Sequence, residues 1–176
     1  MIKAHDLTLV QWAQQPLSTL SDKIEAACKR FKLESATAEE VRVAASVCAH
    51  CPPATARRPG VVQLILRMAH TLPSLPVSAM VTVVAALHRV LRDGRVSDAT
   101  LLPKLLVVLD AATGAGVPVP CDLAQLAAQC IQQLMVHGCS AATWARVTKA
   151  FEFCALRFPG AAATHFRVCP THHTPF

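Results

Sequence analysis

The chain has 176 residues, of which 53% are hydrophobic and only 16% are charged. This length suits one domain or one short array of repeats and is sufficient to bury a sizeable core. Because so little charge is unusual for a free monomer, we expect partners to cover much of the outside; the alternative is an aggregation-prone monomer.

The charge balance and the cysteines suggest a partner and a compartment. Lys and Arg exceed Asp and Glu by 17 to 11, and a mild excess of this kind favours an anionic partner such as RNA without requiring one. Most of the 8 Cys lie in apolar sequence that is expected to be helical, and no secretory signal precedes them. We therefore expect free thiols in a reducing compartment. No apolar run predicts a membrane span, and no transit peptide is evident.

The first part of the chain predicts short helices separated by prolines. Residues 6–14 (DLTLVQWAQ) predict an opening helix that is capped by Asp6. Its apolar side chains are Leu7, Val10 and Trp12. After Pro16 a longer helix is expected over residues 18–31, where apolar residues recur at spacings of three and four.

The next two helices have clear boundaries. Thr37 and Glu40 form the pattern of a capping box, which predicts a helix that runs from there to Pro52. Residues 54–60 (ATARRPG) predict a loop, and a second helix is expected over 60–72.

The stretch from Pro76 to Gly116 is the most regular part of the chain. It predicts one helix over 77–92 and another over 97–113. Pro103 requires the second helix to begin near residue 100, because Pro is tolerated only in a first turn.

The last helices are expected over residues 121–137 and from Ser140 to about Phe158. Gly138 fits the glycine that commonly follows a helix C-terminus. The tail, 159–176, has no period and predicts irregular structure.

Three pairs of helices match one another at a spacing of about 40 residues, which is typical of an α-solenoid. Their first helices align on the steps Ala44-Ala45, Ala85-Ala86 and Ala127-Ala128, with Val43, Val84 and Leu126 beside them. Their second helices align on Leu64, Leu105 and Val147 and on Met68, Leu109 and Phe151. The alternative is a compact helical bundle in which the alanine matches arise by chance.

This pattern, illustrated by SAMVTVVAALHRVL and SDATLLPKLLVVLDAATGAG, resembles octotricopeptide and FAST-kinase-like helical repeats, and also helical proteins of divergent protist mitochondrial ribosomes. The resemblance covers about residues 37–157. It implies a mitochondrial protein of RNA metabolism. No RAP-type domain follows the repeats, which argues against a nuclease.

The expected fold is therefore all-α: a short, HEAT- or octotricopeptide-like α-solenoid of about three helix pairs. N-terminal helices occupy residues 1–36, the repeat array 37–158, and an irregular tail 159–176.

A zinc site is the first chemical hypothesis. Cys48 and Cys51 form a CxxC, and Cys169 and His172 form a CxxH, so together they have the ligands of a tetrahedral site. The two halves lie in distant parts of a linear array, however, and Cys48 and Cys51 also fit one buried helix face. We expect core packing and no metal or other cofactor.

Catalytic signatures are absent from the sequence. There is no Gly-rich phosphate loop, no strand–turn–helix nucleophile motif and few acidic residues. We expect a protein that is not an enzyme.

RNA binding is the third hypothesis. Gln63, Lys104 and Arg146 occupy equivalent positions in the second helices, and one polar residue per repeat is how helical-repeat proteins contact a strand. The residues predicted to contact RNA are Arg57, Arg58, Arg67, Lys104, Arg146 and Lys149. The plain alternative is that exposed helix positions require polar residues.

The leading hypothesis is a subunit of a mitochondrial ribosome or RNA-processing complex that binds RNA and neighbouring proteins. The alternative is a protein–protein adaptor without RNA contact. In either case the C-terminal aromatic residues would close the array or insert into a partner. They are Phe153, Phe158, Phe166 and Phe176.

Overall fold

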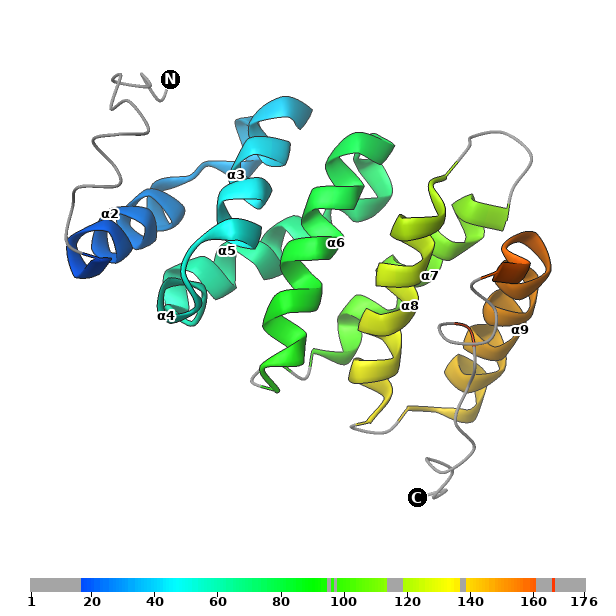
Figure 1. Ribbon diagram of the computed structural model, residues 1–176. Helices are drawn as coiled ribbons and strands as arrows, with labels where there is room; N and C mark the ends of the chain where they lie inside the picture. The colour runs from blue at the N-terminus through cyan, green and yellow to red at the C-terminus, as the bar shows by residue number, and fades with distance from the viewer. Residues whose placement is uncertain are drawn as a thin grey trace.

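The computed structural model describes residues 17–94, 96, 98–113, 119–136, 139–160 and 166. These residues form helices and no strands (Figure 1), which confirms the all-α expectation. The α-helices are α2 (Leu17–Arg30), α3 (Ala38–His50), α4 (Pro53–Ala56), α5 (Pro59–His70), α6 (Val77–Arg92), α7 (Leu102–Thr113), α8 (Cys121–Met135) and α9 (Ala141–Arg157). Single-turn 3-10 helices are η1 (Leu33–Ser35), η2 (Leu72–Ser74) and η3 (Ala99–Leu101). The opening helix expected over 6–14 lies outside the described residues.

The longer helices are arranged in two layers (Figure 1). In the first layer α3 packs on α6, and α6 packs on α8. In the second layer α2 packs on α5 and α7 packs on α9, while η2 connects α5 to α7. Contacts of α5 with α6 and of α7 with α8 join the layers.

The capping box that begins α3 is confirmed. The Glu40 amide donates to Thr37 Oγ1 at 3.3 Å, and the Thr37 amide donates to Glu40 Oε2 at 2.8 Å. Two backbone donors that the helix leaves without partners are thereby satisfied.

The expected loop at 54–60 was wrong, because α4 makes one helical turn there. Pro52 and Pro53 fix backbone angles suited to a helix start, and the Thr55 and Ala56 amides donate to the Pro52 carbonyl. The buried Thr55 hydroxyl also forms a hydrogen bond with Ser21 of α2, 34 positions away in the sequence. This tertiary contact holds a turn that the local sequence does not predict.

The regular stretch folds as expected at both of its breaks. Gly94 follows α6 with a φ of +69°, a conformation that suits glycine. Pro103 is the second residue of α7, so its missing amide falls in the first turn. The chain before α7 forms η3, where the Thr100 amide donates to Asp98 Oδ1 at 3.0 Å.

The last two helices also match their expected extents. Ser140 caps α9, accepting a hydrogen bond from the Thr143 amide at 3.2 Å. His137 and Gly138 lie outside the described residues, so the expected glycine stop is not tested.

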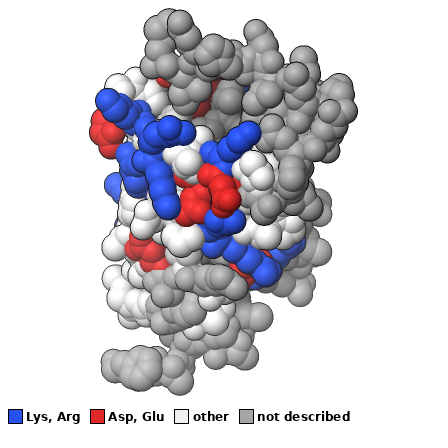
Figure 2. Space-filling view, turned by 90° about the vertical axis from the view of Figure 1, so that its left-hand side faces the viewer, with Lys and Arg blue, Asp and Glu red and all other residues white. Residues whose placement is uncertain are grey.

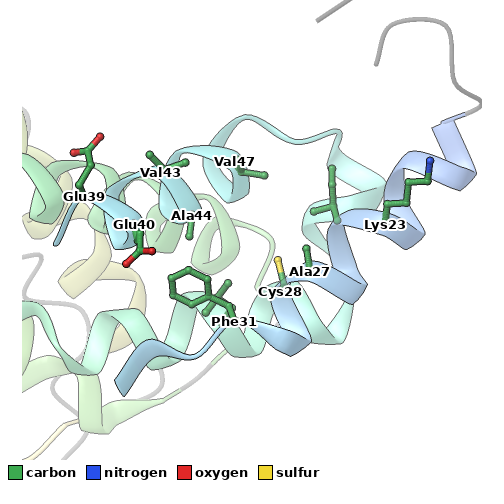
Figure 3. A pocket seen from close by; sticks show the side chains of 11 residues that line it. Lys23, Ala27, Cys28, Phe31, Glu39, Glu40, Val43, Ala44 and Val47 are labelled. Carbon is green, nitrogen blue, oxygen red and sulfur yellow. The ribbon is translucent and has the colours of Figure 1, made fainter. Parts of the chain in front are cut away.

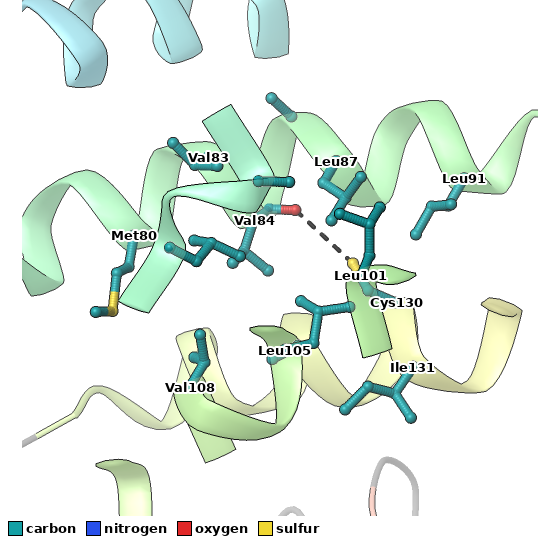
Figure 4. Close-up of a cluster of buried hydrophobic side chains, with 14 of the residues drawn as sticks. Met80, Val83, Val84, Leu87, Leu91, Leu101, Leu105, Val108, Cys130 and Ile131 are labelled. Carbon is teal, nitrogen blue, oxygen red and sulfur yellow. Dashed lines mark hydrogen bonds between the residues drawn. The ribbon is translucent and has the colours of Figure 1, made fainter. Parts of the chain in front are cut away.

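The core is continuous from α2 to α9, and Figure 4 shows the part of it where α6, α7 and α8 meet. Leu87, Leu105 and Ile131 are buried there. The Cys130 thiol, also buried, donates to the Val84 carbonyl at 3.9 Å, so it packs as a small apolar side chain with one weak hydrogen bond.

Most residues that align in the sequence are also buried at matching positions. Fully or almost fully buried are Ala45, Ala86 and Ala128, then Leu64, Leu105 and Val147, then Met68, Leu109 and Phe151. Other aligned residues differ in burial: Val43 is 49% exposed and Leu126 is half-buried although their counterpart Val84 is buried, and Ala44 and Ala85 are half-buried although Ala127 is buried.

An aromatic cluster covers the end of the core near α9. Phe166 is buried with its ring centroid 6.2 Å from that of Phe151 and 6.4 Å from that of Phe158. Phe153, by contrast, is largely exposed. The rest of the tail, including Phe176, lies outside the described residues.

Candidate interaction surfaces

The predicted polar column lies on the second layer. Gln63 is on α5, Lys104 on α7 and Arg146 on α9. Gln63 and Arg146 are exposed, Lys104 is half-buried, and each directly precedes a buried apolar residue. The three polar residues therefore occupy the same position relative to the buried face of the helix on which each lies.

Lys104 and Arg146 form no ion pair or hydrogen bond within the described part of the chain. Lys149, one turn beyond Arg146, lies with Nζ 5.9 Å from the centre of the Phe153 ring. A cation–π contact leaves the ammonium charge uncompensated by an acid. These three predicted RNA contacts thus keep their charge available to an anion.

Arg57 and Arg58, in contrast, form ion pairs between segments. Arg57 Nε lies 2.9 Å from Asp93 Oδ2. Arg58 Nη1 lies 2.8 Å from Asp22 Oδ1 and 3.1 Å from Glu25 Oε2 on α2. A phosphate would have to compete with these carboxylates.

Arg67 is held in a similar way. Its Nη2 lies 2.8 Å from Glu34 Oε1, and its Nη1 donates to the Phe31 carbonyl at 3.5 Å. Exposed pairs of this kind contribute only about 0–1 kcal/mol, so they weaken RNA contact by Arg67 without preventing it.

Glu25 on α2 is the centre of a group of ion pairs and hydrogen bonds with Lys29, Arg58 and the Gly60 amide. It accepts hydrogen bonds from Arg58 Nη1 and from the Gly60 amide, at 3.1 and 3.4 Å, and lies 3.0 Å from Lys29 Nζ. Lys29, followed by Arg58 and the Gly60 amide, holds the pKa of this carboxyl below its ordinary value against the opposing effect of burial. Figure 2 shows charges of both signs on the α2 end of the molecule.

Of the four predicted zinc ligands, the structure describes Cys48 and Cys51, and both are buried. Cys51 donates from Sγ to the Cys48 carbonyl at 3.3 Å. Contact with Cys28, together with burial, raises the pKa of Cys48. The described residues contain no group of three or more side chains placed to hold a metal ion. Cys169 and His172 lie outside them.

Two further buried cysteines have the properties of core residues. Burial raises the pKa of Cys130 and, with the charge of Asp110, raises that of Cys154 to about 11. A thiol that is protonated and hidden from solvent is a poor nucleophile. Burial also lowers the pKa of half-buried His88, with a smaller effect of Arg92.

One hollow was not predicted: an apolar groove of about 480 Å³ between α2 and α3 (Figure 3). Its floor includes Ile24 and Leu64, and its wall on α3 carries Val43 and Val47, which are 49% and 42% exposed. The sequence pattern of α3 could have indicated this groove. These valines form a second apolar stripe on α3, beside the buried stripe of Val41, Ala45 and Cys48.

A second apolar surface lies on the outer face of α9. A shallow hollow of about 610 Å³ is lined there by Trp144 and Phe153, and Leu156 beside them is 80% exposed. Large exposed apolar side chains that cluster on one helix face are typical of contact with another molecule.

Comparison with known proteins found no match among family models, curated proteins or solved structures. Among the described helices, none combines the length and apolar character needed to cross a bilayer.

Proposed function

We propose that this chain is a short α-solenoid that serves as a non-enzymatic subunit of a mitochondrial ribonucleoprotein. Its second layer contacts the RNA backbone, and its outer faces contact neighbouring proteins. The mitochondrial assignment rests on the resemblance of the helix pairs to organellar helical repeats.

The two-layer arrangement supports the solenoid. The proposed units are α3 with α5, α6 with α7, and α8 with α9. First helices pack on first helices, as expected where each unit buries one face against each neighbour. The buried alanines Ala45, Ala86 and Ala128 recur once per unit on the first helices.

One observation carries the RNA proposal. Lys104 and Arg146 have equivalent positions on adjacent second-layer helices, α7 and α9, which pack together, and neither has an acidic partner in the described structure. Cations spaced by one repeat along a row suit the regular phosphates of a nucleic-acid strand, which supply most of the affinity in sequence-independent binding. Lys149 extends the same surface along α9.

The experiment is a titration of single-stranded RNA with the full chain over a range of salt concentrations. The Lys104→Glu/Arg146→Glu variant is compared with Arg30→Glu/Lys32→Glu, which makes the same change in net charge at the exposed α2 end. We expect the first variant to lose most RNA affinity and the second to lose little. Absence of binding at low salt, or equal losses in both variants, would overturn the proposal.

The second candidate is a protein adaptor, favoured by the exposed side chains of Phe153 and Leu156 on α9. If the purified chain binds no RNA, isolation of its native complex under mild salt tests this reading. A Leu156→Glu variant that still assembles with the same proteins would exclude the α9 face as their docking site.

A further inference from the structure

The apolar groove between α2 and α3 lies where the row of described first-layer helices stops. On one side α3 packs on α6, but the described residues place no first-layer helix on its other side. There Val43 and Val47 face the groove, 49% and 42% exposed, beside the half-buried Phe31 and Ala44 (Figure 3). Exposed apolar side chains that cluster in this way are typical of a surface that another molecule covers.

The last described first-layer helix, α8, differs from α3 in this respect. Most positions of α8 that are not buried carry polar side chains, namely Asp122, Gln125, Gln129, Gln132 and Gln133. A helix at the end of an array needs such a polar outer face to remain soluble. Helix α8 meets this requirement and α3 does not, so the valine face of α3 is the one that needs a cover.

Charges of opposite sign lie at the two ends of the groove. Figure 3 shows Lys23 of α2 at one end and Glu39 and Glu40 of α3 at the other, with the apolar lining between them. All three side chains are exposed. Glu39 pairs with Arg42, and Glu40 accepts a hydrogen bond from the Thr37 amide. Because a carboxylate has about four acceptor sites and an ammonium three donors, each of the three can form a further contact.

We propose that this groove is the twofold interface of a homodimer. The α3 helices of the two copies lie antiparallel across the axis, and Val43 and Val47 of each copy cover the groove of the other. The half turn exchanges the ends of the groove, so Lys23 of each copy meets the end of the other copy that carries Glu39 and Glu40. A parallel arrangement brings like charges to the same end, so the charges select the antiparallel one.

The pattern of the groove favours a second copy as its occupant. A twofold interface uses the same patch on both copies, so the patch has to complement itself after a half turn. An apolar centre with opposite charges at its two ends has this property. The interface is separate from the proposed RNA contacts, because Lys104 and Arg146 lie on α7 and α9. The dimer therefore carries the RNA-binding row twice, and its formation does not depend on RNA binding.

The oligomeric state of the full chain tests this proposal. Sedimentation velocity over a range of protein concentrations should give a species with twice the mass of one chain. Val43→Glu/Val47→Glu puts carboxylates into the apolar interface and should reduce the mass to that of one chain. Val107→Glu/Val136→Glu makes the same change at two other exposed valines and should leave the dimer intact. Circular dichroism establishes that both variants keep the helix content of the parent.

An exchange of charges tests the antiparallel arrangement without altering the apolar centre. Lys23→Glu places an acid against the acids of the other copy, and Glu39→Lys places a base against its Lys23. Each variant alone should dimerise several-fold more weakly than the parent at low salt. An equimolar mixture restores an opposite pair at both ends of the interface, so it should form mixed dimers that recover most of this loss.

Three results would overturn the proposal. A chain that stays monomeric at all concentrations would leave the groove to another protein or to another part of this chain. A dimer that survives Val43→Glu/Val47→Glu would form through a different surface, and the α9 face with Phe153 and Leu156 would be tested next. A mixture that dimerises no better than its separate components would show that the charged ends of the groove do not meet across a twofold axis.

Discussion

Arg89 of α6 closes the C-terminal end of α3 by donating from Nη1 to the carbonyl oxygen of Ala49 at 2.6 Å. The same nitrogen lies 3.5 Å from the carbonyl oxygen of Cys48. The last carbonyls of a helix have no partner within it and form the negative end of its dipole, so a guanidinium there satisfies both needs. In the proposed repeat register, the position of Arg89 is held by buried apolar residues in the neighbouring units, Cys48 and Ile131.

Arg89→Met should lower the free energy of unfolding by roughly 2 kcal/mol, the usual contribution of a hydrogen bond to a charged group. Methionine keeps the apolar stem and removes the guanidinium. Urea unfolding measures the effect, with exposed Arg92→Met one turn later on α6 as the control. Equal stabilities of the two variants would show that the bond to Ala49 adds nothing.

Ala86→Leu should destabilise the protein by about 1–3 kcal/mol, because the added carbons have no space in a well-packed core. Ala86 is fully buried on α6, at the position of Ala45 and Ala128. The same change at exposed Ala26 on α2 should alter stability by less than about 0.5 kcal/mol. Thermal unfolding of both variants compares them, and a tolerated leucine at residue 86 would argue against close approach of first-layer helices.

The helices could be predicted because their signals are local. The Thr37–Glu40 capping box and the Pro103 rule depend on residues within one turn of each other, and both hold. The turn of α4 could not be predicted in the same way, because its Thr55 hydroxyl bonds to Ser21 on another helix. Contacts between distant segments leave no periodic trace in the sequence.

The same distinction explains the candidate surfaces. Sequence placed the cations of Arg57, Arg58 and Arg67 on exposed positions, but their carboxylate partners lie some 33 to 36 residues away along the chain. Which cations remain without an acid depends on how neighbouring helices pack. The groove was missed for a related reason: Val43 aligns with Val84, which is buried, yet the described residues place no first-layer helix against that side of α3.

Glu25→Gln should make the protein less stable at neutral pH and reduce its loss of stability in acid. Lys29, first, and then Arg58 and the Gly60 amide lower the pKa of this carboxyl in the folded state, and the side chain is only 12% exposed. Its contribution is therefore fully present above the unfolded-state pKa of about 4.3 and is lost as pH falls through the lower folded value. Urea unfolding at neutral pH and at a series of acid values should show the variant and the parent converging below that range. Exposed Glu152→Gln is the control, and equal acid slopes for all three proteins would contradict the prediction.

Removal of the Arg57–Asp93 pair should leave RNA binding unchanged, whereas removal of the Lys104 charge should not. Arg57→Gln/Asp93→Asn deletes an ion pair of zero net charge whose atoms are 2.9 Å apart, so no phosphate contact is lost if Asp93 already holds the guanidinium. Lys104→Gln removes a cation with no acidic partner in the described structure, and each lost contact to a single strand lowers the salt slope by about 0.7. Plots of log affinity against log salt for both variants make the comparison. A slope that falls equally in both would place Arg57 on the RNA and show that phosphate displaces Asp93.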